Sequence, residues 1–246
     1  MGAGTGSNCL YFIEQLEQNQ NWYLVEQNEG LKQATIRRFR DYANFHKYTF
    51  ERKKDTLKIT SLRKNIQVTI INGSLLDLEK LVDLRKVDLV IANAVFDLFS
   101  AVQIDQFVQV ISKNKLSFYT TLNYQVMAFT PDDPFDSVFV EEYNKHMERP
   151  QAFGKALGKD AADYMVKLLD AAEGQVETAN SSWQVGIDDI KMHYYLLNFM
   201  ENALSEMDLE ANMQVNFQSW IDRKKELIIT RQQRLAINHL DILFAS

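Results

Sequence analysis

The amino-terminal segment alternates glycine with other residues, and this pattern constrains the fold more than any other feature of the chain. Gly2, Gly4 and Gly6 are followed, twenty positions after the last of them, by the acidic residue Glu26. Because glycine has no Cβ, such a segment turns tightly and can approach a ligand closely. A carboxylate at the end of the next strand can accept hydrogen bonds from ribose hydroxyls. The pairing predicts an adenosine-type cofactor bound by an α/β sheet.

The spacing of the glycines narrows the identity of that cofactor. The dinucleotide-binding fingerprint has its third glycine three positions after the second, whereas here that position holds Ser7. Residues 2–8 read Gly-Ala-Gly-Thr-Gly-Ser-Asn, which resembles the first motif of the class I S-adenosylmethionine-dependent methyltransferases. The resemblance implies S-adenosylmethionine as cofactor. The alternatives are an NAD site and a glycine-rich loop of some other α/β fold.

The resemblance also implies a set of cofactor-binding residues. They are Gly2, Gly4, Gly6, Glu26, Ser74, Leu75, Asn93 and Ala94. By resemblance, the glycines pass beneath the methionine portion, the carboxylate binds the ribose, the Ser-Leu pair contacts the adenine, and the Asn-Ala pair flanks the methyl donor. A solvated carboxylate at a strand end is the alternative for Glu26.

Methyl transfer from a sulfonium is a direct displacement, so the protein supplies position and a route for proton loss. A carboxylic acid acceptor needs no general base, while a hydroxyl or amine acceptor can need one. The candidate catalytic residues are His146, Tyr124 and Asp97. A surface role is the alternative for His146, and Asp97 either points into the pocket or begins the following helix.

Short apolar runs alternate with amphipathic stretches, which is typical of βαβ units and a mostly parallel sheet. Strands are predicted at 22–25, 66–71, 87–92, 116–122, 176–181 and 235–244, and helices at 28–45, 100–111, 135–147, 160–172, 188–206 and 211–232. The basic segment 51–65 is expected to be a solvated hairpin or loop. By resemblance the fold is a Rossmann-like methyltransferase domain spanning 1–246, with 235–244 in an antiparallel edge hairpin and 123–174 as a substrate cap.

The chain departs from the family at its beginning. In the family the first motif follows a hydrophobic strand at the centre of the sheet, whereas here Met1 directly precedes Gly2. We therefore expect the first strand to be missing, which would leave two neighbouring strands with unpaired edges. Either the natural protein has upstream residues, or the chain does not bind cofactor normally.

The composition of the chain limits the kinds of partner and site that it can have. The formal net charge is −6, which argues against a nucleic acid or an anionic membrane as partner. The single cysteine, Cys9, excludes a disulfide framework within the chain, and the four histidines are too scattered to predict a metal site. No apolar run approaches the about twenty residues of a membrane span. We expect a cytoplasmic protein of open oligomeric state.

Three functions remain compatible with these observations. The first is methyl transfer from S-adenosylmethionine to a small-molecule acceptor, whose identity and reacting atom the sequence leaves open. The second is a non-catalytic or truncated methyltransferase-like protein, suggested by the missing strand. The third, an NAD(P)-dependent oxidoreductase, is disfavoured by Ser7 and by the lack of a Tyr-x-x-x-Lys pair placed for hydride chemistry.

Overall fold

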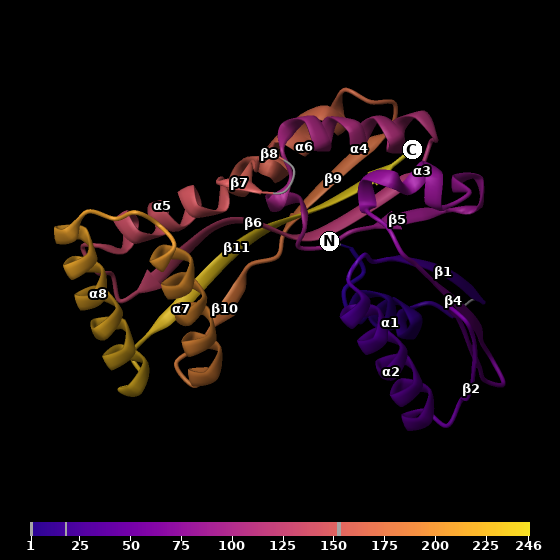
Figure 1. Ribbon diagram of the computed structural model, residues 1–246, viewed down its shortest axis with the longest axis horizontal. Coiled ribbons are helices and arrows are strands. Elements are labelled where there is room, and N and C mark those ends of the chain that lie inside the picture. The colour runs from indigo at the N-terminus through magenta and orange to yellow at the C-terminus, as the bar shows by residue number, and fades with distance from the viewer. Residues whose placement is uncertain (1, 18, 152–153) are drawn as a thin grey trace. The chain divides into compact units, whose positions relative to one another are not determined.

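The computed structural model describes residues 2–17, 19–151 and 154–246, and it divides into two compact units, one up to Asp88 and one from Leu89 (Figure 1). Each unit combines helices with a sheet of its own. The α/β class is therefore confirmed.

The first unit contains a four-stranded sheet in the order β1-β4-β3-β2. Its elements are α1 (Ser7–Gln15), β1 (Gln20–Val25), α2 (Glu29–Phe45), β2 (Thr49–Lys53), β3 (Thr56–Thr60), β4 (Asn65–Ile71), η1 (Leu75–Asp77), α3 (Leu78–Leu81) and η2 (Leu84–Lys86). The β1–β4 pair is parallel and the other two pairs are antiparallel. The β2–β3 hairpin confirms the hairpin alternative for the basic segment.

Helix α2 shows how local sequence positions the first unit's core. Asn28 caps it, because its Oδ1 accepts a hydrogen bond from Leu31 N at 3.0 Å. One face of the helix is buried, and Phe39 and Ala43, four residues apart on that face, are fully inaccessible. They belong to a core cluster with Ile13 of α1 and Val68 of β4, so the helices cover the sheet through a continuous apolar contact.

The second unit is built around two long antiparallel strands, β6 and β11. Its elements are β5 (Leu89–Ile91), η3 (Phe96–Leu98), α4 (Ala101–Lys113), β6 (Ser117–Thr130), α5 (Asp136–Met147), β7 (Pro150–Gln151), β8 (Gly154–Lys155), η4 (Gly158–Asp160), α6 (Ala161–Asp170), β9 (Gln175–Asn180), β10 (Trp183–Val185), α7 (Ile190–Ser205), α8 (Ala211–Ile229) and β11 (Arg234–Ala245). The sheet order is β10-β11-β6-β5, and β9 also pairs with β11. Helix α6 packs on this sheet, and α7 lies beside α8 (Figure 1).

Two features of the sheets differ from the sequence-based expectation. Strand β6 continues to Thr130 instead of ending near 122, because β11 pairs along it from Phe118↔Phe244 to Thr130↔Arg234. Parallel pairing is less extensive than predicted: among the described strands only β1–β4 and β5–β6 are parallel. The strand expected at 235–244 is antiparallel, as β11 shows, but the expected edge position is wrong: β6 pairs with one side of β11, and β9 and β10 pair with the other.

Strands β1 and β5 each stand at the end of their own sheet. Strand β1 pairs only with β4, and β5 pairs only with β6, within the described parts of the chain. The glycine-rich segment that precedes α1 lies against the end of β1, where Ala3 N donates to Val25 O at 2.9 Å.

One apolar cluster of the second unit contains Phe139 of α5 and Trp220 of α8, both fully buried, while Phe96, Phe107 and Phe118 pack against one another outside it. The rings of Phe139 and Trp220 lie 5.2 Å apart between centroids. None of the helices in the described residues has the length and apolar character needed to cross a bilayer.

Candidate functional site

The glycine-rich bend and Glu26 are in direct contact in the first unit. Gly4 N donates to Glu26 Oε2 at 2.9 Å, and Asn28 N donates to Oε1 at 2.8 Å. Glu26 directly follows β1 and is only 2% exposed. Both of its oxygens therefore accept hydrogen bonds from main-chain N–H groups, so the carboxylate fixes the conformation of the bend.

The glycines of the bend serve different steric purposes. Gly4 has a φ of 57°, and a Cβ built there would meet no atom within 4 Å, so the space beside it is open. At Gly6 a Cβ would come within 2.5 Å of the Phe39 ring, so this glycine lets the bend pack on α2. The hydroxyl of Thr35 donates to Gly4 O at 3.0 Å, which ties the bend to the same helix.

The ends of β1 and β4 lie at one edge of the first sheet. The strands pair in parallel up to Val25↔Ile71, and Glu26 N donates to Ile71 O at 3.0 Å. Ser74 follows this edge, and its Oγ accepts from Leu76 N at 3.3 Å at the start of η1, while Leu75 is buried. Ser74 thus follows the same sheet edge as Glu26, and its role toward an adenine stays a prediction.

In the second unit, Asn93 and Ala94 come after β5 and bind the main chain of β6. Asn93 Oδ1 accepts from Thr121 N at 3.2 Å, and Ala94 N donates to Thr121 O at 3.0 Å. Ala94 has a φ of 52° and Leu122 one of 59°. Positive φ is uncommon outside glycine, and such strain concentrates at functional sites. The sequence carries no signal for either conformation, because neither residue is a glycine or asparagine.

Asp97 lies in η3 and is half-buried, with its Oδ1 inaccessible to solvent. Its Oδ1 has no hydrogen-bond partner among the residues that the structure describes, and burial raises the pKa of the carboxyl above its usual value. The charge of Asp97 in turn adds to the effect of burial in raising the pKa of Tyr143. A buried polar atom without a partner calls for an explanation, of which a catalytic role is one.

Tyr124 lies on β6 and contacts α5. Its hydroxyl donates to Asn144 Oδ1 at 3.1 Å, and its ring packs edge-to-face against Tyr143 with centroids 6.1 Å apart. Burial raises the pKa of Tyr124, so the phenol stays protonated at neutral pH. Sequence analysis missed Tyr143 and Asn144, because the helical pattern of 135–147 does not distinguish them from core positions.

His146 lies in a different environment from Tyr124. Its Nε2 is 3.2 Å from Glu206 Oε2, and Arg149 contacts both the histidine and that carboxylate. This cluster joins the end of α5 to the end of α7. The structure therefore places the three catalytic candidates in two settings, Asp97 and Tyr124 in the interior and His146 in an ion-pair cluster.

A cavity of about 730 Å³ opens in the second unit between β6, α5 and the start of α6. It is lined by Gln125, Val126, Met127, Ala128, Phe129, Asp132, Asp133, Asp136, Ser137, Val140, Glu141, Asn144, Lys159, Asp160 and Asp163. Its volume is in the range typical of small-molecule sites. In the described part of the chain no group of histidine, cysteine and acidic side chains is arranged to hold a metal ion.

Comparison with known proteins gives structural matches. No protein-family model and no curated protein matches the sequence. A cyclopropane-fatty-acyl-phospholipid synthase-like protein from Lactobacillus casei has a TM-score of 0.51 at 10% identity, covering 99% of this chain and 82% of that one. Geranyl diphosphate C-methyltransferase from Streptomyces coelicolor has a TM-score of 0.44 at 11% identity, covering 100% and 70%.

A third match is phosphoethanolamine N-methyltransferase 2 from Haemonchus contortus. It has a TM-score of 0.40 at 12% identity and covers 99% of this chain, which spans about half (47%) of that enzyme. Identities this low show the fold alone, and the fold agrees with the motif in residues 2–8. The chain therefore has the Rossmann-like fold of the class I S-adenosylmethionine-dependent methyltransferases, which it resembles also in its first motif.

Proposed function

We propose that this chain transfers a methyl group from S-adenosylmethionine to a small-molecule acceptor. The contact between Gly4 N and Glu26 Oε2, with open space beside Gly4, is the observation that carries the proposal. A carboxylate has about four lone-pair positions, so Glu26 can brace the bend and still accept a ribose hydroxyl that enters beside Gly4. The acidic net charge of −6 favours a small molecule over nucleic acid as acceptor.

S-adenosylmethionine supplies an electrophilic methyl group when it is bound. The chain's part is to position the acceptor and to remove a proton where the acceptor has one to lose. Asp97 suits proton removal better than an exposed aspartate does, because its raised pKa makes the ionised form a stronger base. Tyr124 is protonated at neutral pH and its hydroxyl is held by Asn144, so it suits a positioning role. Asn93 and Ala94 stay cofactor candidates by resemblance.

We also propose that residues 1–246 act as one methyltransferase domain with 123–174 as its acceptor-binding segment. The cavity supports this assignment, since all of its lining residues fall between 125 and 163. The second candidate function is a non-catalytic methyltransferase-like protein. It is favoured by one observation, that β1 and β5 each have a strand partner on one side only among the described strands.

Gly4→Arg tests the cofactor site. The arginine side chain would occupy the open space beside the bend, so we expect S-adenosylhomocysteine to bind at least about 100-fold more weakly in isothermal titration, a loss of roughly 2.7 kcal/mol. Gly4→Asn is the matched control, because asparagine tolerates positive φ and fills less space; its affinity should lie between the two. Thermal melts check that both variants fold.

Equal affinity of Gly4→Arg and the wild type for S-adenosylhomocysteine would reject the site, and tighter binding of NADH than of S-adenosylhomocysteine would reject the cofactor. Transfer of an isotopic methyl group into a metabolite extract separates the two candidate functions. A chain that binds S-adenosylhomocysteine but labels nothing is the non-catalytic protein.

A further inference from the structure

Strand β2 forms one edge of the sheet in the first unit (Figure 1). Among the described strands it pairs with β3 alone, in an antiparallel register from Thr49↔Thr60 to Lys53↔Thr56. In an antiparallel pair the main-chain groups of alternate residues face away from the partner strand, so the far side of β2 has N–H and C=O groups that no other described strand binds. Four of its five residues are exposed. An accessible edge of this kind can pair with a further strand.

This edge strand lies in a basic segment of the chain. Residues 47–64 contain seven basic and two acidic side chains, although the whole chain has a net charge of −6. None of the seven basic side chains forms an ion pair within the described residues. Because their charges are not neutralised by the protein, they favour a partner of opposite charge. The exposed ones are Lys47, Arg52, Lys53, Lys54, Lys58 and Arg63.

The two lysines that flank β2 have an unfavourable backbone conformation. Lys47, which follows the end of α2, has a φ of 58°, and Lys54, in the turn between β2 and β3, has a φ of 53°. Positive φ costs free energy in a residue with a Cβ, and glycine or asparagine adopts it more readily. Strain of this kind concentrates at functional sites. Each end of the edge therefore carries a positive charge at a position where the backbone does not favour lysine.

The same charges select the kind of strand that can be added. In the antiparallel pairing of two β2 strands with the fullest overlap, Lys47 of one copy would come next to Lys54 of the other, and the two Glu51 side chains would face each other. Like charges at these positions are destabilising, so a second copy of the chain is disfavoured at this edge. An extended segment with acidic side chains meets the lysines with opposite charge.

We propose that the outer edge of β2 binds an extended acidic peptide segment of another protein, which joins the sheet as an additional strand. Main-chain hydrogen bonds to β2 hold the segment, and its acidic side chains face Lys47, Lys53 and Lys54. This binding does not depend on the proposed function, because none of the residues assigned to the cofactor or to the methyl acceptor belongs to the segment 47–64.

The test is a titration of the whole chain, followed by NMR or fluorescence polarisation, with a short peptide in which glutamate alternates with valine. Three further probes separate the contributions to binding. They are the same peptide with lysine in place of glutamate, the glutamate peptide with all of its backbone amides methylated, and an oligothymidylate of the same net charge. We expect the glutamate peptide to bind at least about tenfold more tightly than each of the three.

Hydrogen exchange locates the bound peptide. Addition of a strand should raise the protection of the amides in residues 49–53, because a ligand that binds the folded edge makes its opening less frequent. A contact between charged side chains alone would leave the exchange of these amides unchanged.

Lys54→Asn separates binding from stability. Asparagine tolerates positive φ better than lysine does, so thermal melts should show no loss of stability, while the glutamate peptide should bind about two- to fivefold more weakly because one exposed charge pair is lost. Lys47→Asn combined with it should weaken binding further. Lys115→Asn is the matched control, because Lys115 is also an exposed lysine, with a φ of 49°, but belongs to the second unit. It should leave the affinity for the peptide unchanged.

The proposal is overturned if the glutamate peptide does not bind at millimolar concentration, or if the methylated peptide binds as tightly as the unmethylated one. Equal binding of the oligothymidylate would also overturn it, since the surface would then recognise phosphate. Two further results would contradict it: unchanged exchange in residues 49–53, and equal effects of Lys54→Asn and Lys115→Asn on the affinity for the peptide.

Discussion

At the scale of single residues, the chain uses its buried polar groups for two purposes. Glu26 is buried with both oxygens engaged by main-chain N–H groups, so it shapes the glycine bend. Asp97 is half-buried, and its inaccessible Oδ1 has no partner among the described residues, so its charged form is poorly solvated. A satisfied carboxylate stabilises structure, whereas an unsatisfied one with a perturbed pKa marks a candidate for chemistry.

Asp97 leads to a prediction about the pH dependence of methyl transfer. If the ionised carboxylate removes a proton, the rate falls as the pH drops through its pKa. Because burial raises that pKa above the ordinary value, the acid limb lies at higher pH than an exposed aspartate would give. Asp97→Asn should lower kcat by about 10²–10⁴ and remove the limb. The measurement is a pH–rate profile of both proteins.

Asp105→Asn is a suitable control for that profile, because Asp105 of α4 is an aspartate whose carboxylate accepts a hydrogen bond from Tyr164. It should keep both the rate and the acid limb. An Asp97→Asn protein with the wild-type profile would show that Asp97 is only a structural residue.

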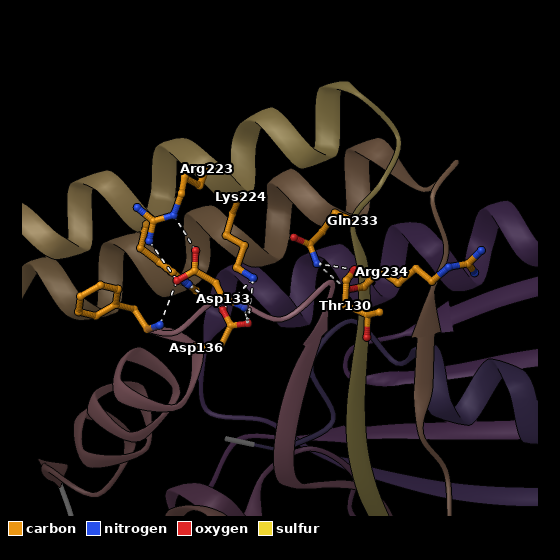
Figure 2. A network of polar contacts seen from close by, with 9 residues as sticks. Thr130, Asp133, Asp136, Arg223, Lys224, Gln233 and Arg234 are labelled. Atoms are coloured by element: carbon orange, nitrogen blue, oxygen red, sulfur yellow. Dashed lines mark hydrogen bonds and ion pairs between the residues drawn. The ribbon is translucent and has the colours of Figure 1, made fainter.

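At the scale of elements, the cavity's outer wall depends on contacts between α8 and the turn before α5. Lys224 has a side chain only 1% exposed, lies 2.7 Å from Asp136, and sits 4.4 Å from the centre of the Phe129 ring. Trp220 of the same helix donates to Asp136 at 2.7 Å. Helix α8 therefore holds in place the start of α5 and, through Arg223 and Asp133, the turn before it (Figure 2).

Lys224→Met tests the strength of this connection. Removing one partner of a buried ion pair leaves an uncompensated charge, so we expect a loss of about 3–5 kcal/mol in the free energy of unfolding. The double variant Lys224→Met, Asp136→Leu should recover part of it, because no buried charge then remains. Urea unfolding provides the measurement.

Lys225→Met is the matched control for this prediction. Lys225 is the next residue of α8 and forms a partly exposed pair with Glu201 at 3.3 Å, so its replacement should cost no more than about 1 kcal/mol. If the Lys224 and Lys225 variants lose equal stability, the buried pair is not the connection that matters.

At the scale of the whole molecule, each of the two units has a separate core. Phe39 and Val68 belong to one cluster of buried residues, and Phe139 and Trp220 belong to another. Their charges also differ: residues 1–88 contain 14 basic and 11 acidic side chains, whereas residues 89–246 contain 13 and 22. The net negative charge of the chain thus arises in the unit that contains the cavity.

Because the buried residues of the two units form separate clusters, we predict two steps of unfolding. Peptides from β1 and β4 should lose protection against hydrogen exchange at one urea concentration, and peptides from β6 and β11 at another, because opening free energies follow contiguous cooperative units. S-adenosylhomocysteine should raise protection in residues 2–8 and 24–28 by mass action. Loss of protection at a single urea concentration throughout the chain would contradict the first expectation, and unchanged exchange in those segments would contradict the second.

The elements were largely predictable from the sequence because they depend on local patterns. The Asn28 cap and the buried face of α2 follow from a capping residue and a helical apolar spacing. The extension of β6 to Thr130 was not predictable, because its pairing with β11 joins residues more than a hundred positions apart. The strain at Ala94 was equally invisible, since alanine gives no sign of positive φ.

The sequence by itself determined the bend. Glycines at alternate positions have the conformational freedom that the turn at Gly4 requires, and the acidic residue that follows the next strand comes to the same sheet edge. Only the tertiary structure decided which polar groups are satisfied. In the tertiary structure His146 contacts Glu206 and Arg149, whereas Asp97 keeps one oxygen without a partner within the described chain. The cavity likewise forms only where three elements meet. The physical reason is that burial and pairing depend on contacts between distant segments, which no local pattern encodes.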